Sequence, residues 1–223
     1  GLGKVKELIE KAEGGFVPNT SAKAVEADLD KLMEFFEQRD CWTFNIPTLY
    51  EKLPGGASGE FMIFFARPEV GKTAGWVSLV AGPGGFCEQG AKVLAFTNEE
   101  PAERTMMRAI SARTGLTRKQ IFDNKGLAVS RMGDLRDMVK IYDDKDNELT
   151  LDFIDAECKL HKPDVIVIDQ LDKVETHGSF DRPDLRLAHI YRQAREIAKR
   201  HNCFVVAISQ AGAEADGKTH VLP

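Results

Sequence analysis

The sequence lacks any apolar run long enough to cross a membrane, and no signal peptide opens it. It also lacks paired cysteines, because Cys41, Cys87, Cys158 and Cys203 stand far apart along the chain. This scatter fits the reduced thiols of a cytosol better than a disulfide framework or a zinc site. The histidines show no ligand spacing either. The sequence therefore predicts an intracellular protein without membrane contact and without a transition-metal site.

A strong charge of one sign is absent as well. The 223 residues carry 30 lysines and arginines against 35 acidic residues, which gives a net charge of −5. No global basic field attracts nucleic acid, so any such binding must come from local loops or from a ring of subunits. The length and the 43% hydrophobic content suit one sizeable α/β core.

The chain is organised around one loop between a predicted strand at 61–65 and a predicted helix. Its residues are Ala66, Arg67, Pro68, Glu69, Val70, Gly71, Lys72 and Thr73. In a P-loop the backbone N–H groups and the helix N-terminus bind phosphates, the lysine reaches the β and γ phosphates, and the hydroxyl serves magnesium. The sequence therefore predicts an ATP site with Mg²⁺, in which Ala66 stands where most P-loops have glycine.

A second apolar run, 92–97, predicts a buried parallel strand that is followed by Asn98, Glu99 and Glu100. Polar groups at the carboxyl end of such a strand lie where open α/β sheets bind ligands. Glu99 is the candidate general base, which would orient a water for attack on the γ-phosphate. The alternative is that both glutamates only cap the helix that opens at Pro101. The P-loop favours the catalytic interpretation.

Two more strands are expected at 163–169 and 204–208. The first is continuous, β-branched and ends in Asp169, which could hold magnesium opposite Thr73. The second leads into Ser209 and Gln210. The side-chain amide of Gln210 could contact the γ-phosphate and report its loss, so Gln210 is the candidate sensor.

The segment before the P-loop strand predicts a helix at 4–13 and a longer one at 20–38, capped by Thr20 or Ser21. The longer helix has an apolar stripe that either packs on its own core or docks on a neighbouring subunit. A short amphipathic piece at 46–53 follows and is broken at Pro54.

The remaining segments are less regular. The glycine-rich stretch 82–85 predicts a flexible connection, 117–122 a helical turn, and 138–142 a strand. The acidic stretch 143–147 predicts a solvated turn that could close a hairpin. Helices are expected from Thr150 to His161 and along the apolar face at 187–198, with a polar loop at 172–184 between the last strands.

Together the four strand ends resemble the RecA-like ATPase core, and more closely the DnaB-type replicative helicases of bacteria and their phages. The resemblance is carried by A-R-P-x-x-G-K-T at 66–73, Thr-Asn-Glu at 97–99, V-I-V-I-D-Q-L at 165–171 and A-I-S-Q at 207–210. It implies a mostly parallel sheet flanked by helices, with Lys72 and Thr73 on phosphate and magnesium, Glu99 as base, Asp169 as the Walker B acid and Gln210 as sensor. It also implies a bacterial cytoplasm or a phage-infected cell.

The resemblance further implies partners. These are single-stranded DNA, copies of the same chain in a ring that we expect to be a hexamer, and replisome proteins. Residues 1–44 are expected to form a helical arm and 45–223 the ATPase core. The basic residues of the loops after the Asp169 and Gln210 strands, Lys173, Arg182 and Lys218, are the candidates for DNA contact.

In this family further strands, a DNA loop and an arginine finger follow the Gln210 position, so we expect a core that is incomplete at Pro223. Such a chain alone should hydrolyse ATP slowly, because an arginine finger is worth roughly 10³ to 10⁵ in rate. Two other functions stay open at this point: a RecA-like recombinase, and a nucleotide switch that only gates assembly.

Overall fold

The computed structural model of the chain describes residues 25–37, 39–145, 148–178 and 180–210. The chain divides into two compact units, Gly1–Arg39 and Asp40–Pro223, and each is described here by itself. Three predicted features lie outside the described residues. They are the helix at 4–13, the candidate helix caps Thr20 and Ser21, and the candidate DNA contact Lys218.

In the first unit the helix α2 spans Leu29–Glu37. The expected continuous helix at 20–38 is wrong over 25–28, which are not helical. The local reason is Asp28, whose carboxylate accepts a hydrogen bond from the backbone N–H of Lys31 at 3.3 Å, the interaction that starts a helix. No residue of α2 is buried, and its apolar residues Leu29, Met33 and Phe36 are exposed.

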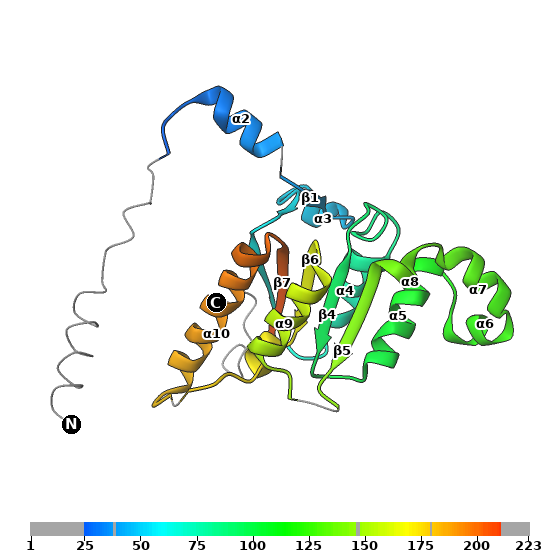
Figure 1. Ribbon diagram of the computed structural model, residues 1–223. Coiled ribbons are helices and arrows are strands. Elements are labelled where there is room, and N and C mark those ends of the chain that lie inside the picture. Colours follow the sequence, from blue (N-terminus) through cyan, green and yellow to red (C-terminus); the bar gives the residue numbers. More distant parts are fainter. Residues whose placement is uncertain (1–24, 38, 146–147, 179, 211–223) are drawn as a thin grey trace. The chain divides into compact units, whose positions relative to one another are not determined.

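The second unit is built on a five-stranded sheet with the strand order β3-β7-β6-β4-β5 (Figure 1). The strands are β3 (Phe61–Ala66), β4 (Val93–Thr97), β5 (Val139–Asp143), β6 (Val165–Asp169) and β7 (Phe204–Gln210). Every neighbouring pair in this sheet is parallel. The parallel sheet confirms the fold class expected from the apolar runs.

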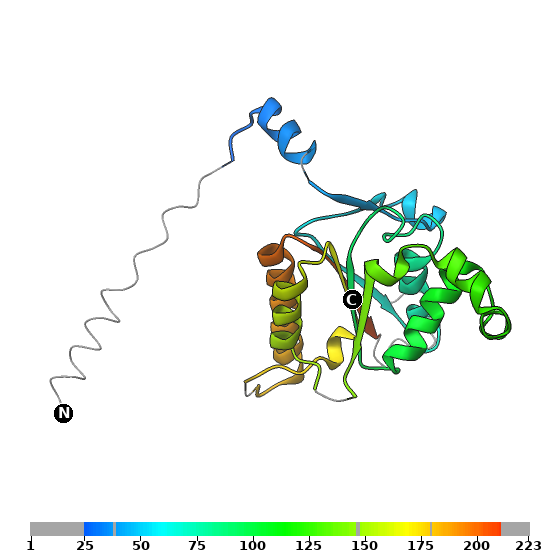
Figure 2. The ribbon, with the colours of Figure 1, turned by 45° about the vertical axis from the view of Figure 1, so that its right-hand side comes forward.

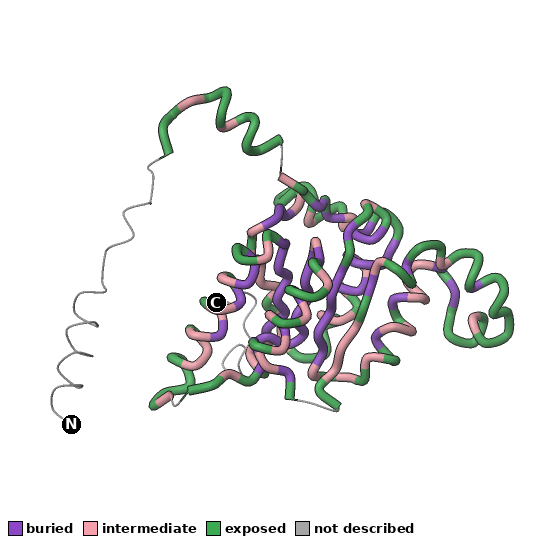
Figure 3. The backbone as a smooth tube through the Cα atoms, viewed as in Figure 1, coloured by how far each residue is buried: buried purple, intermediate pink, exposed green. Residues whose placement is uncertain are grey.

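Helices cover both faces of the sheet (Figure 2). They are α4 (Lys72–Ala81) and α5 (Ala102–Thr114) on one face, and α9 (Leu151–His161) and α10 (Pro183–His201) on the other. Successive strand residues point to opposite faces, so Val165 and Val167 pack in the cluster under α4 and α5, whereas Ile166 and Ile168 pack under α9 and α10. Figure 3 shows that burial concentrates along these strands.

Several short elements complete the second unit. They are β1 (Cys41–Thr43), α3 (Pro47–Tyr50), β2 (Gly55–Ala57), α6 (Arg118–Asp123), α7 (Lys125–Met132), α8 (Leu135–Met138) and the 3₁₀ turn η1 (Leu171–Lys173). The expected turn at 117–122 is confirmed as α6, which a capping box of Thr117 and Gln120 begins. The helices α7 and α8 are not anticipated by the sequence interpretation.

The break expected after Leu53 instead contains a strand. β2 pairs with β1 in an antiparallel two-stranded sheet, so Cys41–Thr43 belongs with the second unit. Gly56 permits this because a Cβ there would lie 2.1 Å from the ring of Phe204, closer than any real side chain tolerates. The division of the chain into an arm at 1–44 and a core at 45–223 stays a prediction.

The hairpin expected at 143–147 is wrong. β5 lies parallel to β4 at an edge of the described sheet, and α9 follows before the chain returns as β6. The carboxylate of Asp143 accepts a hydrogen bond from the backbone N–H of Ala102 at 2.7 Å. Asp143 therefore caps α5, and the acidic residue has a defined partner rather than a purely solvated role.

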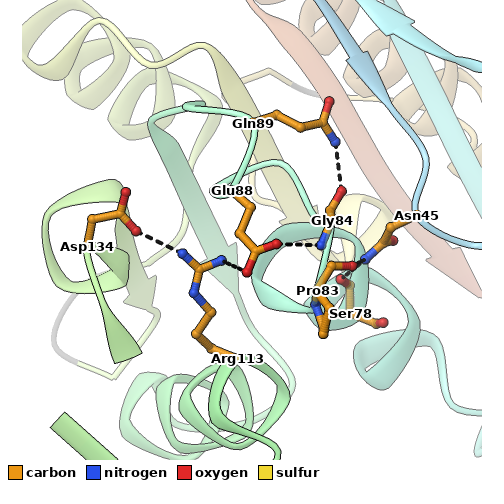
Figure 4. Close-up of polar contacts among 8 residues, drawn as sticks. All are labelled: Asn45, Ser78, Pro83, Gly84, Glu88, Gln89, Arg113 and Asp134. Carbon is orange, nitrogen blue, oxygen red and sulfur yellow. Dashed lines mark hydrogen bonds and ion pairs between the residues drawn. The ribbon is translucent and has the colours of Figure 1, made fainter. Parts of the chain in front are cut away.

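The glycine-rich connection at 82–85 is not the flexible segment that its composition predicts. Glu88 accepts a hydrogen bond from Gly84 N–H at 2.7 Å, and Asn45 donates to the carbonyls of Ser78 and Pro83, both at 2.9 Å (Figure 4). Arg113 of α5 forms ion pairs with Glu88 at 2.7 Å and with Asp134 at 2.8 Å. This network ties the connection to α5 and to the start of α8.

Three of the four cysteine thiols lie in the packed interior. Cys87, Cys158 and Cys203 are buried, and burial raises the pKa of all three, to about 12 for Cys87 and Cys203. Cys41 is exposed.

Among the described residues, no helix combines the length and apolarity that a membrane span requires.

Candidate active site at the strand ends

The P-loop begins at the end of β3 and ends in the first turn of α4. Ala66 is the last residue of β3 and keeps an ordinary negative φ, so its methyl group is accommodated without strain. The turn itself lies in the left-handed region at Glu69 (φ 59°) and Gly71 (φ 92°). Gly71 precedes α4 as its N-cap and exposes the helix N-terminus to the loop. Loops of this kind direct backbone N–H groups toward an anion.

Lys72 lies at the start of α4 with its ammonium group folded over the loop. Its Nζ donates a hydrogen bond to the carbonyl oxygen of Arg67 at 3.0 Å. Three consecutive P-loop residues, Pro68, Glu69 and Val70, are exposed. The loop is thus open to solvent above the helix N-terminus, where a phosphate chain can enter.

Asp169, the last residue of β6, is fully buried and is bonded to α4. Its Oδ2 accepts two hydrogen bonds, from the hydroxyl of Thr73 at 2.9 Å and from the indole Nε1 of Trp76 at 2.7 Å. Its Oδ1 is buried and has no hydrogen-bond partner among the described residues. A buried oxygen without a partner is costly unless another group satisfies it.

The charges and hydrogen bonds around Asp169 also favour a cation beside its carboxylate. Burial raises the pKa of its carboxyl group above 3.8, the hydrogen bonds from Trp76 and Thr73 lower it, the negative charge of Glu99 raises it, and the charge of Lys72 lowers it. A divalent cation would favour the ionised carboxylate in this environment. Mg²⁺ prefers oxygen ligands and keeps several waters, so the unpartnered Oδ1 of Asp169 and the hydroxyl of Thr73 fit a magnesium site.

Glu99 and Glu100 follow β4 but have different surroundings. Glu100 forms an ion pair with Arg108 at 3.0 Å and accepts a hydrogen bond from Thr105 at 3.2 Å. Glu99 is exposed, and no hydrogen bond or ion pair of its side chain occurs among the described residues. Neither glutamate side chain binds a backbone N–H of α5 among the described residues, whereas Asp143 accepts from the N–H of Ala102. Of the two carboxylates, Glu99 is the one available to a water molecule.

Asn98 joins the ends of β4 and β6. Its backbone N–H donates to the carbonyl of Asp169 at 2.9 Å, its side-chain Nδ2 donates to the carbonyl of Gln170 at 3.0 Å, and its Oδ1 accepts from the N–H of Gln170 at 2.8 Å. The side chain thus continues the strand pairing by one residue beyond Thr97 and Asp169, which are register partners. Glu99 and Asp169 are held on neighbouring strand ends by this contact.

Gln210 ends β7 and is the register partner of Ala66, the first residue of the P-loop. The neighbouring Ser209 is buried, and its hydroxyl lies 2.9 Å from the hydroxyl of Tyr191 on α10. The structure therefore brings Lys72, Thr73, Glu99, Asp169 and Gln210 to one edge of the sheet.

The three candidates for DNA contact do not form one group. Lys173 lies exposed in η1, directly after the Asp169 strand. Arg182 is also exposed, but its guanidinium binds the carboxylate of Asp184 at 2.6 and 3.0 Å. Lys218 lies outside the described residues.

Comparison with known proteins identifies the family. The family model for the DnaB-like helicase C-terminal domain matches residues 44–223. The chain belongs to the DnaB-like helicase C-terminal domain family. Among curated members, it is 26% identical over 218 residues to the probable plasmid replicative DNA helicase of Chlamydia muridarum, covering 89% of this chain and 48% of that protein. It is 28% identical over 189 residues to the replicative DNA helicase DnaB of Haemophilus influenzae, covering 75% and 38%.

The chain thus spans about half the length, or less, of these curated members of the family. Solved structures agree on the fold. A DnaB-like replicative helicase described with its interactions with primase superposes with a TM-score of 0.71 at 17% identity, covering 98% of this chain and 55% of that chain. A second solved structure, described as an ATPase domain, gives a TM-score of 0.69 at 18% identity, covering 89% of this chain and 76% of that chain.

The structure shows contacts at the candidate site that the motif assignments do not predict, namely those of Trp76, Asn98 and Asp143. A signal for Trp76 exists in the sequence, because it stands three residues after Thr73 and side chains at that spacing share one helix face. Asn98 stands in the Thr-Asn-Glu motif, but its bonds to Gln170, like the bond between Asp143 and Ala102, have no comparable signal. These bonds cross between strands and helices whose adjacency only the fold defines.

We predict that Asn98→Ala lowers the free energy of unfolding by about 1–3 kcal/mol, because it leaves the buried backbone groups of Gln170 without partners. Urea denaturation followed by circular dichroism measures the change. The control is Arg195→Ala, which removes an exposed side chain of α10 and should change the stability by less than about 0.5 kcal/mol. Equal stability of the two variants would contradict the structural role of Asn98.

Proposed function

We propose that the chain is the ATPase motor core of a replicative DNA helicase, which couples ATP hydrolysis to movement along single-stranded DNA. The main observation that supports this proposal is the contact between the P-loop helix and the buried Asp169, with Glu99 at the end of the adjoining strand. Membership of the DnaB-like family, whose curated members include replicative DNA helicases, supports the same proposal.

In this proposal the P-loop residues 66–73 bind the triphosphate of ATP. When ATP binds, the ammonium group of Lys72 leaves the carbonyl oxygen of Arg67 and donates hydrogen bonds to phosphate oxygens instead. The positive N-terminal end of the α4 dipole also attracts the phosphates. Thr73 and Asp169 would hold magnesium. When bound, this ion neutralises charge on the β and γ phosphates.

Glu99 then acts as the general base. Its exposed carboxylate accepts a proton from a water molecule and orients that water toward the γ-phosphate. Gln210 lies beside the first residue of the P-loop, where its amide can contact the γ-phosphate. Its neighbour Ser209 binds Tyr191, so a shift at Gln210 can pass to α10.

The proposal includes a ring of identical subunits, expected to be a hexamer, and contact with replisome proteins. Its support is the family and the exposed apolar stripe of α2, whose residues Leu29, Met33 and Phe36 are free to cover a surface of another copy. Closed rings in electron micrographs are expected. Open filaments would favour the recombinase alternative.

The assignment of Lys72 and Glu99 is tested by Lys72→Ala and Glu99→Gln. Lys72→Ala should abolish ATP binding, measured with a fluorescent ATP analogue. Glu99→Gln should bind the analogue normally but lose about 10²- to 10⁴-fold in hydrolysis rate, measured with single-stranded DNA present, because only the proton transfer is removed.

The matched control for Glu99→Gln is Glu100→Gln, which makes the same change on a carboxylate already engaged by Arg108 and Thr105. This control should hydrolyse ATP at nearly the parental rate. Normal hydrolysis by Glu99→Gln together with loss in Glu100→Gln would move the base to Glu100.

The DNA path is proposed to follow the loops after the Asp169 and Gln210 strands. Of the two candidates in the described part, Lys173 is the better placed, since Arg182 is paired with Asp184. Lys173→Ala should weaken single-stranded DNA binding and reduce the salt slope by about 0.7 for the lost phosphate contact. The control, Lys159→Ala, removes an exposed charge in the last turn of α9. Equal slopes in both variants would place the DNA elsewhere.

A further inference from the structure

Trp76 is a core residue that also reaches the candidate magnesium site. The side chain is 2% exposed and packs in the cluster under α4 and α5. Its indole N–H nevertheless does not end in apolar surroundings, because it donates to Oδ2 of Asp169 at 2.7 Å. A buried tryptophan needs a partner for this N–H, and here the partner is the carboxylate at the end of β6.

Two donors on α4 converge on the same oxygen. Thr73 and Trp76 are three residues apart, so they lie on one face of the helix. The hydroxyl of Thr73 can turn about its Cβ–Oγ bond and can also accept, whereas the indole is a donor only and its ring is fixed by packing. Trp76 therefore keeps Oδ2 engaged whichever way the hydroxyl of Thr73 points.

We propose that Trp76 is a positioning residue for the cation site, which fixes the carboxylate of Asp169 with Oδ2 turned to α4 and leaves Oδ1 as the oxygen for the hydrated cation. This inference rests on the proposed ATPase function. It goes beyond the motif residues because the buried Trp76 acts only through its bond to Asp169. The buried Oδ1, which has no partner among the described residues, is the observation that supports such an arrangement.

The competing explanation is that Trp76 only fills the core. Trp42 offers a matched comparison, because it is the other of the two tryptophans in the chain, it is also buried, and its Nε1 has no hydrogen-bond partner among the described residues. Replacing either residue by phenylalanine removes an indole from the same cluster. Only Trp76→Phe removes a donor from Asp169.

The first experiment measures ADP affinity of the Trp76→Phe and Trp42→Phe chains by calorimetry, in EDTA and at increasing Mg²⁺. In EDTA the two affinities should be equal, since the P-loop is intact in both. The Mg²⁺ concentration that gives half of the gain in affinity should be about 10- to 100-fold higher for Trp76→Phe, the usual cost of losing a group that orients a metal ligand. A purely structural role would leave this concentration unchanged.

The second experiment does not depend on the folding of Trp76→Phe. In the Trp42→Phe chain the only indole N–H resonance belongs to Trp76. With ADP bound, this resonance should shift when Mg²⁺ is added, and it should not shift when Asp169→Asn is combined with Trp42→Phe. A resonance at the same position with and without Mg²⁺ would overturn the inference.

The outcomes separate the inference from the proposed function. If the Trp42→Phe chain binds no ADP at any Mg²⁺ concentration while remaining folded, the proposed function fails, and the inference fails with it. If that chain binds ADP with a Mg²⁺ dependence that Trp76→Phe shares, only the role of Trp76 is overturned.

Discussion

The bond between the P-loop helix and the end of β6 is the interaction on which the candidate site depends. Thr73 and Trp76 donate to one oxygen of Asp169, and burial of that carboxylate makes the loss of either donor costly. The strand registers extend this contact, since Thr97 is opposite Asp169 and Ala66 is opposite Gln210. Because these registers are fixed, holding β6 against α4 also sets where the other strands end relative to the P-loop.

Much of the sheet follows from the sequence, and the reason is visible in β4 and β6. Both strands are buried on both faces, so before their last residues, Thr97 and Asp169, they are apolar without polar alternation, and such runs predict parallel strands. β5 shows the limit of this inference, because its residues are only partly buried and its edge position depends on pairing with β4. The hairpin was expected from the acidic turn alone, and the long-range pairing overrode it.

The site could be anticipated to a similar depth. Motif residues such as Lys72 and Asp169 occupy positions that parallel topology brings together. The contacts that orient them could not be anticipated, because Asn98 bonds to Gln170 across 72 positions of sequence and Trp76 to Asp169 across 93. Composition also misled at 82–85, where glycines predict freedom but Glu88 and Asn45 bind the turn. In each case the deciding partner lies far along the chain.

The central claim is that this strand edge is a magnesium–nucleotide site in which Asp169 supplies the carboxylate. A crystal structure of the chain grown with ADP and Mn²⁺, with data collected at the manganese absorption edge, tests it most directly. We expect an anomalous peak beside Oδ1 of Asp169 and the hydroxyl of Thr73, next to the phosphates on the P-loop. An anomalous peak elsewhere, with ADP in place, would contradict it.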